Sequence, residues 1–175
     1  MERNAIPVEK LLITPHTRWA DQWFLLTAGD FQKGHFNTMT VGWGSFGTMW
    51  KKPFAQVVVR PTRYTYEFMN TYDTFTLCGF PEQYKRALLL LGSKSGRDGD
   101  KIAEAGLTPI AASQVAAPGF AEANLLIECR KIYWDDLESK QFLDPGIENE
   151  YPQKDYHRIY FGEIVAISGI KSYSI

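Results

Sequence analysis

The sequence contains several β-type runs separated by turn residues, and this pattern limits the folds open to the chain. WFLLTAG (23–29) and FNTMTVGW (36–43) flank DFQKGH (30–35), whose Asp, Lys and Gly suit a short hairpin loop. The β-branched run FAQVVVR (54–60) predicts a strand buried on both faces. Strands and helices do not alternate regularly along the chain, so a doubly wound parallel sheet is not expected.

Three further strands are expected later in the chain: TFTLCGF (74–80), ANLLIECRKIYW (123–134) and HRIYFGEIVAISG (157–169). In the last of these, the spacing predicts one apolar face, formed by Ile159, Phe161, Val165 and Ile167. Five or more strands with only a few short helices predict a mainly β fold, an antiparallel β-barrel with short helices.

Three short helices are expected between the strands. PTRYTYEFMN (61–70) predicts a helix capped by Thr62 or Thr65. PEQYKRALLLLGS (81–93) predicts a helix that starts at Pro81 and Glu82, buries Leu88 and Leu91, and ends at a capping Gly92. RDGDKIAEAG (97–106) predicts a further helix with acidic residues near its start.

Length and composition favour one compact domain that spans residues 1–175. The features of the chain described next indicate that this domain is cytoplasmic. The N-terminal MERNAIPVEK lacks the apolar segment of a signal peptide, and no apolar run reaches the ~20 residues of a membrane span. A net charge of -1 gives no reason to expect a nucleic-acid or membrane partner. Cys78 and Cys129 form no CxxC pair, so we expect buried thiols in a reducing compartment.

Residues 37–53, NTMTVGWGSFGTMWKKP, form the first candidate site. Glycines let backbone amides approach a flat ligand, Thr and Ser add donors, and Trp43 could cover a ring. A heteroaromatic ligand and a simple glycine-rich bulge and turn fit the spacing equally well.

Two basic segments are candidate anion sites. In VRPTRYT (59–65), Arg60 and Arg63 stand where a strand meets a helix N-terminus, although either could instead pair with Glu67 or cover the surface. GSKSGRDGDK (92–101) offers Ser93, Lys94, Ser95, Arg97 and Lys101, but it matches neither a P-loop nor a Rossmann fingerprint. A solvated charged turn is the alternative interpretation of that segment.

The sequence provides no recognisable nucleophile or metal site. His16, His35 and His157 lack metal-ligand spacing, and structural or surface roles are expected for them. Asp135 and Asp136 would point to opposite faces of a strand and are interpreted as solvated. Any reaction would therefore depend on a cofactor.

Taken in order, FNTMTVGWGSFGTMWKKPFAQVVVRPTRYTYEFM, GSKSGRDGDK and YPQKDYHRIYFGEI resemble the flavin reductase-like family of FMN-binding split barrels, and its flavoredoxin-like branch in particular. The resemblance runs from about Trp23 to Ile167. It implies a six-stranded antiparallel split barrel, a homodimer, and an FMN site near the subunit interface. It also implies NADH or NADPH as electron donor, or a redox partner protein, and no protein residue as a catalytic group.

The resemblance also implies which residues bind FMN. The isoalloxazine and ribityl groups would lie along Asn37, Thr38, Met39, Thr40, Val41, Gly42 and Trp43. The ribityl phosphate end of FMN would be bound by Arg60, Thr65, Ser93, Lys94, Ser95 and Arg97. The family often has Ala-Ser before this Trp; Val41-Gly42 here removes a hydroxyl from the flavin edge.

Three functions stay open at this point. The first is an NAD(P)H-dependent flavin reductase that transfers hydride to flavin. The second is a flavoredoxin-like FMN electron carrier for a redox partner protein, and the third is a non-catalytic flavin-binding module. The family does not use a Rossmann fingerprint, so the lack of that motif does not separate them.

Overall fold

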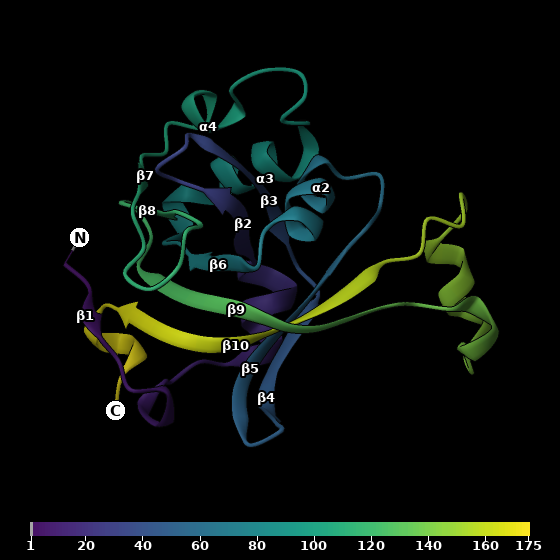
Figure 1. Ribbon diagram of the computed structural model, residues 1–175, viewed down its shortest axis with the longest axis horizontal. Coiled ribbons are helices and arrows are strands. Elements are labelled where there is room, and N and C mark those ends of the chain that lie inside the picture. The colour runs from purple at the N-terminus through teal and green to yellow at the C-terminus, as the bar shows by residue number, and fades with distance from the viewer. Residues whose placement is uncertain (1) are drawn as a thin grey trace.

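The computed structural model describes residues 2–175, and an antiparallel sheet of eight strands dominates it (Figure 1). The strands pair in the order β3-β2-β6-β9-β10-β5-β4, and β1 adds to β10. Their bounds are β1 Asn4–Ala5, β2 Phe24–Asp30, β3 His35–Val41, β4 Gly44–Met49, β5 Lys52–Val59, β6 Thr74–Gly79, β9 Leu125–Asp136 and β10 Arg158–Gly169. A separate two-stranded sheet pairs β7 Pro109–Ile110 with β8 Gly119–Phe120. The expected mainly β, antiparallel architecture with short helices is confirmed; the eight strands of the main sheet include β1, which has only two residues.

The α-helices are short, and α2, α3 and α4 gather on one side of the molecule (Figure 1). Their bounds are α1 Pro15–Thr17, α2 Tyr64–Thr71, α3 Lys85–Ser93 and α4 Lys101–Glu104. Short 3-10 helices cover Val8–Lys10, Glu82–Tyr84, Ser139–Gln141, Pro145–Glu150 and Lys171–Tyr173, and a π-helical segment covers Arg18–Gln22. None of the helices within residues 2–175 has the length and apolar character needed to cross a membrane.

Two hydrophobic cores share the central strands. Phe24, Leu26 and Phe75 belong to the larger core inside the curved sheet, whereas the alternate residue Leu25 faces a smaller core beneath α3. Successive strand residues point to opposite faces, so β2 and β6 are buried on both sides. Leu88 and Leu91 fill the smaller core from α3, as their helical spacing predicted.

Strand β5 is fully buried along one face and only partly buried along the other, so the expectation of burial on both faces was wrong. Ala55, Val57 and Val59 are buried, whereas Val58 is half-buried. On the other face Phe54 is buried, and the half-buried Val58 side chain lines a pocket. Sequence analysis also missed β4, which forms a hairpin with β5 from the glycine-rich 44–49 segment.

The prediction of which residues form the buried face of β10 was also wrong. The buried residues include Tyr160, Ile164 and Ile167 rather than Ile159 and Phe161. A β-bulge between Ile164 and Ala166 inserts an extra residue, which reverses the alternation halfway along the strand.

The helix ends differ from the expected ones in three places. Helix α2 has Arg63 at its N-cap and no side-chain cap, so neither Thr62 nor Thr65 serves that role. Helix α3 continues through Gly92, where a Cβ would lie 3.1 Å from that of Thr40 on β3. Helix α4 is shorter than expected, because the Asp100 side chain caps it at the amides of the following turn.

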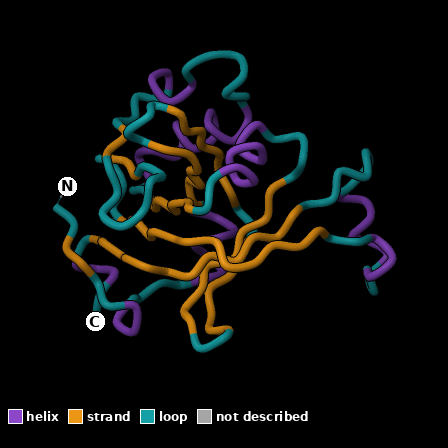
Figure 2. The backbone as a smooth tube through the Cα atoms, in the orientation of Figure 1, coloured by secondary structure: helices purple, strands orange, loops and turns teal. Residues whose placement is uncertain are grey.

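The connection between β9 and β10, residues 137–157, projects from the body of the molecule as an arm of turns and loops (Figures 1 and 2). Arg158, at the start of β10, donates to both carboxylate oxygens of Asp136 at 2.7 and 2.8 Å. This ion pair corrects the interpretation of Asp136 as merely solvated. At the base of the arm, Tyr151 and His157 are buried.

Both cysteines are buried, as expected. Burial raises the pKa of Cys78 to about 12 and also raises the pKa of Cys129. Both side chains therefore stay protonated and act as small core residues.

Candidate functional site

Three pockets meet around Arg63, close to the end of β3. The β3 pocket, of about 190 Å³, is lined by Met39, Thr40, Val41, Gly42, Trp43, Val58, Arg60, Arg63 and His157. The α2 pocket, of about 70 Å³, lies between the start of α2, the end of α3 and the loop that follows α3. The arm pocket, of about 490 Å³, is lined by Arg60, Thr62, Arg63, Pro152, Gln153 and Asp155.

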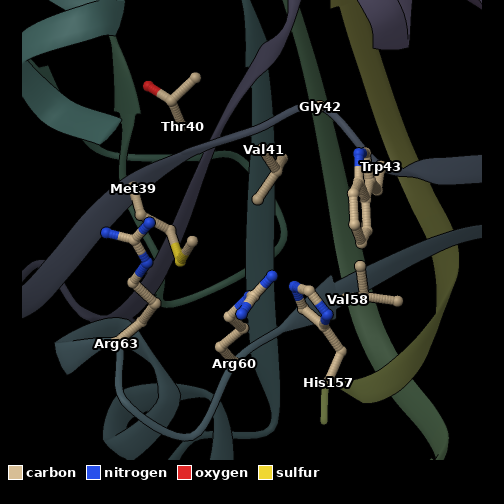
Figure 3. A pocket seen from close by; sticks show the side chains of 9 residues that line it. All are labelled: Met39, Thr40, Val41, Gly42, Trp43, Val58, Arg60, Arg63 and His157. Atoms are coloured by element: carbon tan, nitrogen blue, oxygen red, sulfur yellow. The ribbon is translucent and has the colours of Figure 1, made fainter. Parts of the chain in front are cut away.

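Side chains from β3 form one wall of the β3 pocket. Figure 3 shows Met39, Val41 and Trp43 pointing toward the space that Arg60, Arg63 and His157 enter from the other side, while Thr40 points away. The Thr40 hydroxyl donates to the Leu88 carbonyl of α3 at 2.5 Å, which ties the strand to the helix. Because β3 ends the pairing path of the sheet, its outer backbone groups are available to a ligand.

One end of the β3 pocket, where Trp43 faces His157, is aromatic and uncharged (Figure 3). The rings of Trp43 and His157 lie 5.1 Å apart at 47°. His157 Nδ1 is 2.8 Å from the Tyr151 hydroxyl. Burial, helped by the charge of Arg60, lowers the pKa of His157 to about 4. His157 is therefore neutral at pH 7, so it offers a flat face and a hydrogen-bonding group rather than a charge.

The α2 pocket is built around an uncapped helix N-terminus. Asn37 donates its amide to the Thr65 hydroxyl at 2.8 Å, and both residues are buried. Gly96 packs so closely on Asn37 that a Cβ would lie 2.2 Å from Asn37 Oδ1. These contacts hold the loop after α3 against the first turn of α2. Since no side chain caps α2, its first amides can bind an anion.

Arg63 is an exposed cation at this junction that no described carboxylate neutralises, a property that it shares with the buried Lys101. Arg63 Nη1 donates to the Gly92 carbonyl at 3.1 Å, and no carboxylate within residues 2–175 forms a salt bridge with it. In contrast, the other three loop cations are paired: Arg60 with Asp155, Lys94 with Glu104 and Arg97 with Glu67. An anion entering the junction would therefore meet Arg63 first.

Lys101 lies behind the α2 pocket and supports its wall. Its Nζ donates to the carbonyls of Leu91 at 3.0 Å and Lys94 at 2.9 Å, at the C-terminus of α3. Burial, reinforced by Arg63, lowers the pKa of Lys101 to about 8. Most Lys101 side chains are charged at pH 7, so a second cation stands behind the loop.

Most of the residues expected at the site lie at these pockets. Met39, Thr40, Val41, Gly42, Trp43 and Arg60 line the β3 pocket, and Asn37, Met39, Thr65, Ser93, Lys94 and Ser95 line the α2 pocket. Thr38 and Arg97 line neither of them. Thr38 is buried and donates to the Leu26 carbonyl, and Arg97 lies over the Tyr64 ring. Arg60 and Lys94 line different pockets, which Arg63 connects.

Several lining residues were not among those expected to bind FMN, and Arg63, Lys101, Val58 and His157 are the ones that matter for the chemistry of the site. Arg63 and Lys101 were visible as cations in the correct segments, but the sequence does not show which cations carboxylates neutralise. Val58 was expected in a buried strand. His157 is more than a hundred residues from β3 in the sequence, and no motif marks it. No group of three or more His, Cys, Asp or Glu side chains within the described residues could hold a metal ion.

Comparison with known proteins identifies the family. Residues 18–173 match the flavin reductase like domain, so the chain belongs to the flavin reductase-like family. No match was found among curated proteins.

Solved structures agree with that assignment. Flavoredoxin of Desulfovibrio vulgaris (Miyazaki F) is 25% identical with a TM-score of 0.66, over 86% of this chain and 70% of that one. An FMN-binding domain of a flavin reductases-like enzyme from Shewanella baltica OS155 is 17% identical with a TM-score of 0.69, over 96% and 77%. The NADH:FAD oxidoreductase SgcE6 of Streptomyces globisporus C-1027 is 14% identical with a TM-score of 0.64, over 86% and 76%. The last two similarities show the fold alone.

Proposed function

We propose that this chain is a single-domain, FMN-binding oxidoreductase that acts as an NAD(P)H-dependent flavin reductase. Its strands would form the family's six-stranded split barrel, with the flavin ring along β3 and the phosphate in the α2 pocket. The observation that carries this proposal is the position of Arg63. It is free of carboxylates and lies beside an uncapped helix N-terminus where the β3 and α2 pockets meet.

The α2 pocket fits a phosphate dianion. Amides of the first turn of α2 and the hydroxyl of Ser95 can donate to its oxygens, and Arg63 supplies a charge-assisted bond. The Ser93 hydroxyl donates to the Leu89 carbonyl of α3 and instead stabilises the end of that helix. Lys101 adds positive charge from behind the loop. Lys94 lines the pocket, but its Nζ pairs with Glu104, so its backbone is better placed than its charge to contribute.

The β3 pocket fits the flat ring. Met39, Val41 and Trp43 provide apolar contact, and Gly42 contributes its backbone to the lining, since a Cβ there would face Trp19 and Trp23. Neutral His157 can hydrogen-bond a ring heteroatom without adding a charge. A bound flavin supplies the hydride and electron transfer chemistry. The protein positions the ring, and no residue of the chain is assigned a proton-transfer role.

An FMN electron carrier that serves a redox partner protein is the second candidate, supported by the similarity to a flavoredoxin at 25% identity. A non-catalytic flavin-binding module is the third. Anaerobic mixing with NADH and then NADPH separates them. Rapid bleaching of the flavin band supports the reductase, and bleaching only by a reduced protein supports the carrier.

The central test is Arg63→Ala. Because a charge-assisted hydrogen bond contributes about 1.5–3 kcal/mol, FMN affinity should fall about 10- to 100-fold. Riboflavin lacks the phosphate, so its affinity should change little. Arg86→Ala removes an exposed arginine from α3 and serves as the matched control. Titration followed by flavin fluorescence measures both ligands, and a wild-type protein that binds riboflavin as tightly as FMN would contradict the phosphate assignment.

The remaining expectations about the molecule stay proposals. We propose that the protein is a cytoplasmic homodimer, as the family resemblance implies. The exposed aromatic side chains at the β4–β5 hairpin and the outer part of β9 offer a surface for the second copy.

A further inference from the structure

A fourth pocket, the α3 pocket, lies on the side of β3 that faces α3. Its volume is about 280 Å³, and its lining includes Trp23, Thr40, Gly42, Leu88, Leu89 and Ser93. Thr40 points away from the β3 pocket (Figure 3), and its hydroxyl contacts the Leu88 carbonyl of α3. Both pockets nevertheless include Thr40 and Gly42 in their lining, so they share the end of β3 as a wall. A ligand in the α3 pocket therefore lies across one strand from the position proposed for the flavin ring.

The lining of the α3 pocket favours an uncharged ligand. Trp23, Leu88 and Leu89 supply apolar surface. The two hydroxyls are already used, since Thr40 donates to the Leu88 carbonyl at 2.5 Å and Ser93 donates to the Leu89 carbonyl at 2.9 Å. Within residues 2–175, no acidic or basic side chain lines this pocket, in contrast to the α2 and arm pockets. A charged group entering it would lose hydration without gaining a partner.

The Trp23 ring is held at this pocket by an unusual backbone conformation. Trp23 follows the π-helical segment Arg18–Gln22 with φ 64° and ψ 165°, a combination that residues with a Cβ rarely adopt. Its Nε1 donates to the Ala20 carbonyl at 3.1 Å, and Lys85 Nζ lies 3.3 Å from the ring centre. A Cβ at Gly42 would lie 3.2 Å from Trp23 Cδ1, so glycine leaves room for the ring. Strained backbone of this kind clusters at binding sites, which indicates that the position of the indole has a function.

We propose that the α3 pocket binds an uncharged, planar aromatic electron acceptor of the quinone class. An indole wall beside two leucines fits a flat apolar ring. Since the lining has no acidic or basic side chain, the chemistry within reach of a bound ring is that of the flavin. This inference rests on the proposed function, because the electrons come from the flavin reduced at the β3 pocket.

The transfer balances without any further reactant. The reduced flavin loses two electrons and two protons, and the quinone gains two of each to become a hydroquinone, with water carrying the protons. Electron transfer across one strand does not require contact between the two rings, whereas hydride transfer would. The donor and the acceptor would then approach from opposite sides of β3.

Leu89 allows a direct test, because it is 54% exposed and lines the α3 pocket but not the β3, α2 or arm pockets. Leu89→Gln removes apolar contact without adding a charge, and it should weaken binding of duroquinone about three- to tenfold. Duroquinone is fully substituted, so it does not add to thiols. Leu12→Gln makes the same change at a leucine that is 52% exposed elsewhere and serves as the matched control. Equilibrium dialysis of duroquinone against protein without flavin measures the dissociation constants.

Trp23→Leu gives a second variant, which keeps an apolar side chain but removes the flat ring. It should weaken duroquinone binding about two- to tenfold. The inference is supported if both variants bind duroquinone more weakly while Leu12→Gln binds it as the wild type does. It is overturned if the wild type does not bind duroquinone, or if both variants bind it as tightly as the wild type. If saturating FMN abolishes duroquinone binding, the pocket holds part of the flavin and the acceptor assignment fails.

Reoxidation of the reduced flavin tests the electron transfer itself. With FMN-loaded protein in stopped flow, Leu89→Gln should slow reoxidation by subsaturating duroquinone about three- to tenfold. Reoxidation by ferricyanide should not change, because an anion gains no partner in this pocket. Equal slowing with both acceptors would overturn the inference.

Failure of the main proposal and failure of this inference give different results. Dialysis without flavin tests the pocket even if FMN does not bind. Loss of FMN binding in the wild type would overturn the proposed function and, with it, the electron transfer. Absence of duroquinone binding in a protein that binds FMN would overturn the acceptor inference alone.

Discussion

At the scale of single residues, salt bridges with carboxylates determine which cationic side chains remain free to bind an anion. Arg60, Lys94 and Arg97 stand in the segments that suggested a phosphate site, and each is paired with an acidic side chain. Arg63 lies within three residues of Arg60, and no described carboxylate neutralises it. The phosphate assignment therefore moves to Arg63, whereas Arg60 positions the base of the arm.

His157 makes stability depend on pH through its buried, neutral ring. Its pKa falls from 6.5 in the unfolded chain to about 4 in the folded protein. Between these values the unfolded chain binds more protons, so this contribution is present above pH 6.5 and lost as the pH falls toward 4. The loss should approach roughly 2–3 kcal/mol.

Urea unfolding at pH 7 and pH 4.5 checks this prediction. His157→Gln keeps a hydrogen-bonding group for Tyr151 but does not titrate in this range. The wild type should lose more free energy of unfolding than the variant between the two pH values, because carboxylate effects are common to both proteins. Equal losses would show that His157 is not the group responsible.

At the scale of elements, the β4–β5 hairpin shows local backbone strain. Its turn residues Trp50 and Lys51 have φ values of 53° and 59°, in the left-handed region that disfavours side chains with a Cβ. Asn-Gly is the usual pair at such a turn. The sequence signal for the hairpin is therefore weak, which explains why β4 was missed.

Lys51→Gly should relieve this strain and raise the free energy of unfolding by about 1 kcal/mol. Lys51→Ala removes the same side chain but keeps the Cβ, so it should not stabilise the protein. Chemical denaturation of the three proteins at one pH compares them. An equal gain in both variants would mean that the lysine side chain, rather than its backbone angle, is unfavourable.

At the scale of the whole molecule, exposed aromatic side chains lie at the tip of the β4–β5 hairpin and near the end of β9. Trp50 is 58% exposed at the tip of the β4–β5 hairpin, and Trp134 is 52% exposed near the end of β9. The Trp50 ring packs 5.9 Å from that of Tyr133, so the tip of the hairpin and β9 form a joint aromatic surface. Trp134, the next residue of β9, points to the other face of the strand, where its ring lies 3.8 Å from the Arg158 guanidinium. Large aromatic side chains dominate the binding energy of many protein interfaces.

If this surface holds the proposed homodimer, Trp50→Ser should raise the dimer dissociation constant at least about tenfold. Leu143→Ser removes an apolar side chain that is 98% exposed on the arm, and it should leave the dimer unchanged. Sedimentation velocity over a concentration series measures both variants. A wild-type protein that stays monomeric at high concentration would contradict the homodimer.

The sequence determined the local features of this protein. The β2–β3 hairpin, the strands at β6, β9 and β10, and the buried face of α3 follow from periodicity and turn residues, which act over a few positions. The ordered motifs also identified the family, and the expected residues of β3 other than Thr38 line the β3 or α2 pocket. Local pattern was insufficient where one extra residue, as in the β10 bulge, changed the faces of a strand.

Only the tertiary structure decided how distant segments meet. It placed His157 opposite Trp43, neutralised Arg60 with Asp155, left Arg63 free of carboxylates, and left α2 without a side-chain cap. Each of these depends on contacts between residues far apart in the chain, so no local window of the sequence contains it. Charge and burial at a site are properties of the folded surroundings, which is why the sequence indicated the type of site and the fold selected its residues.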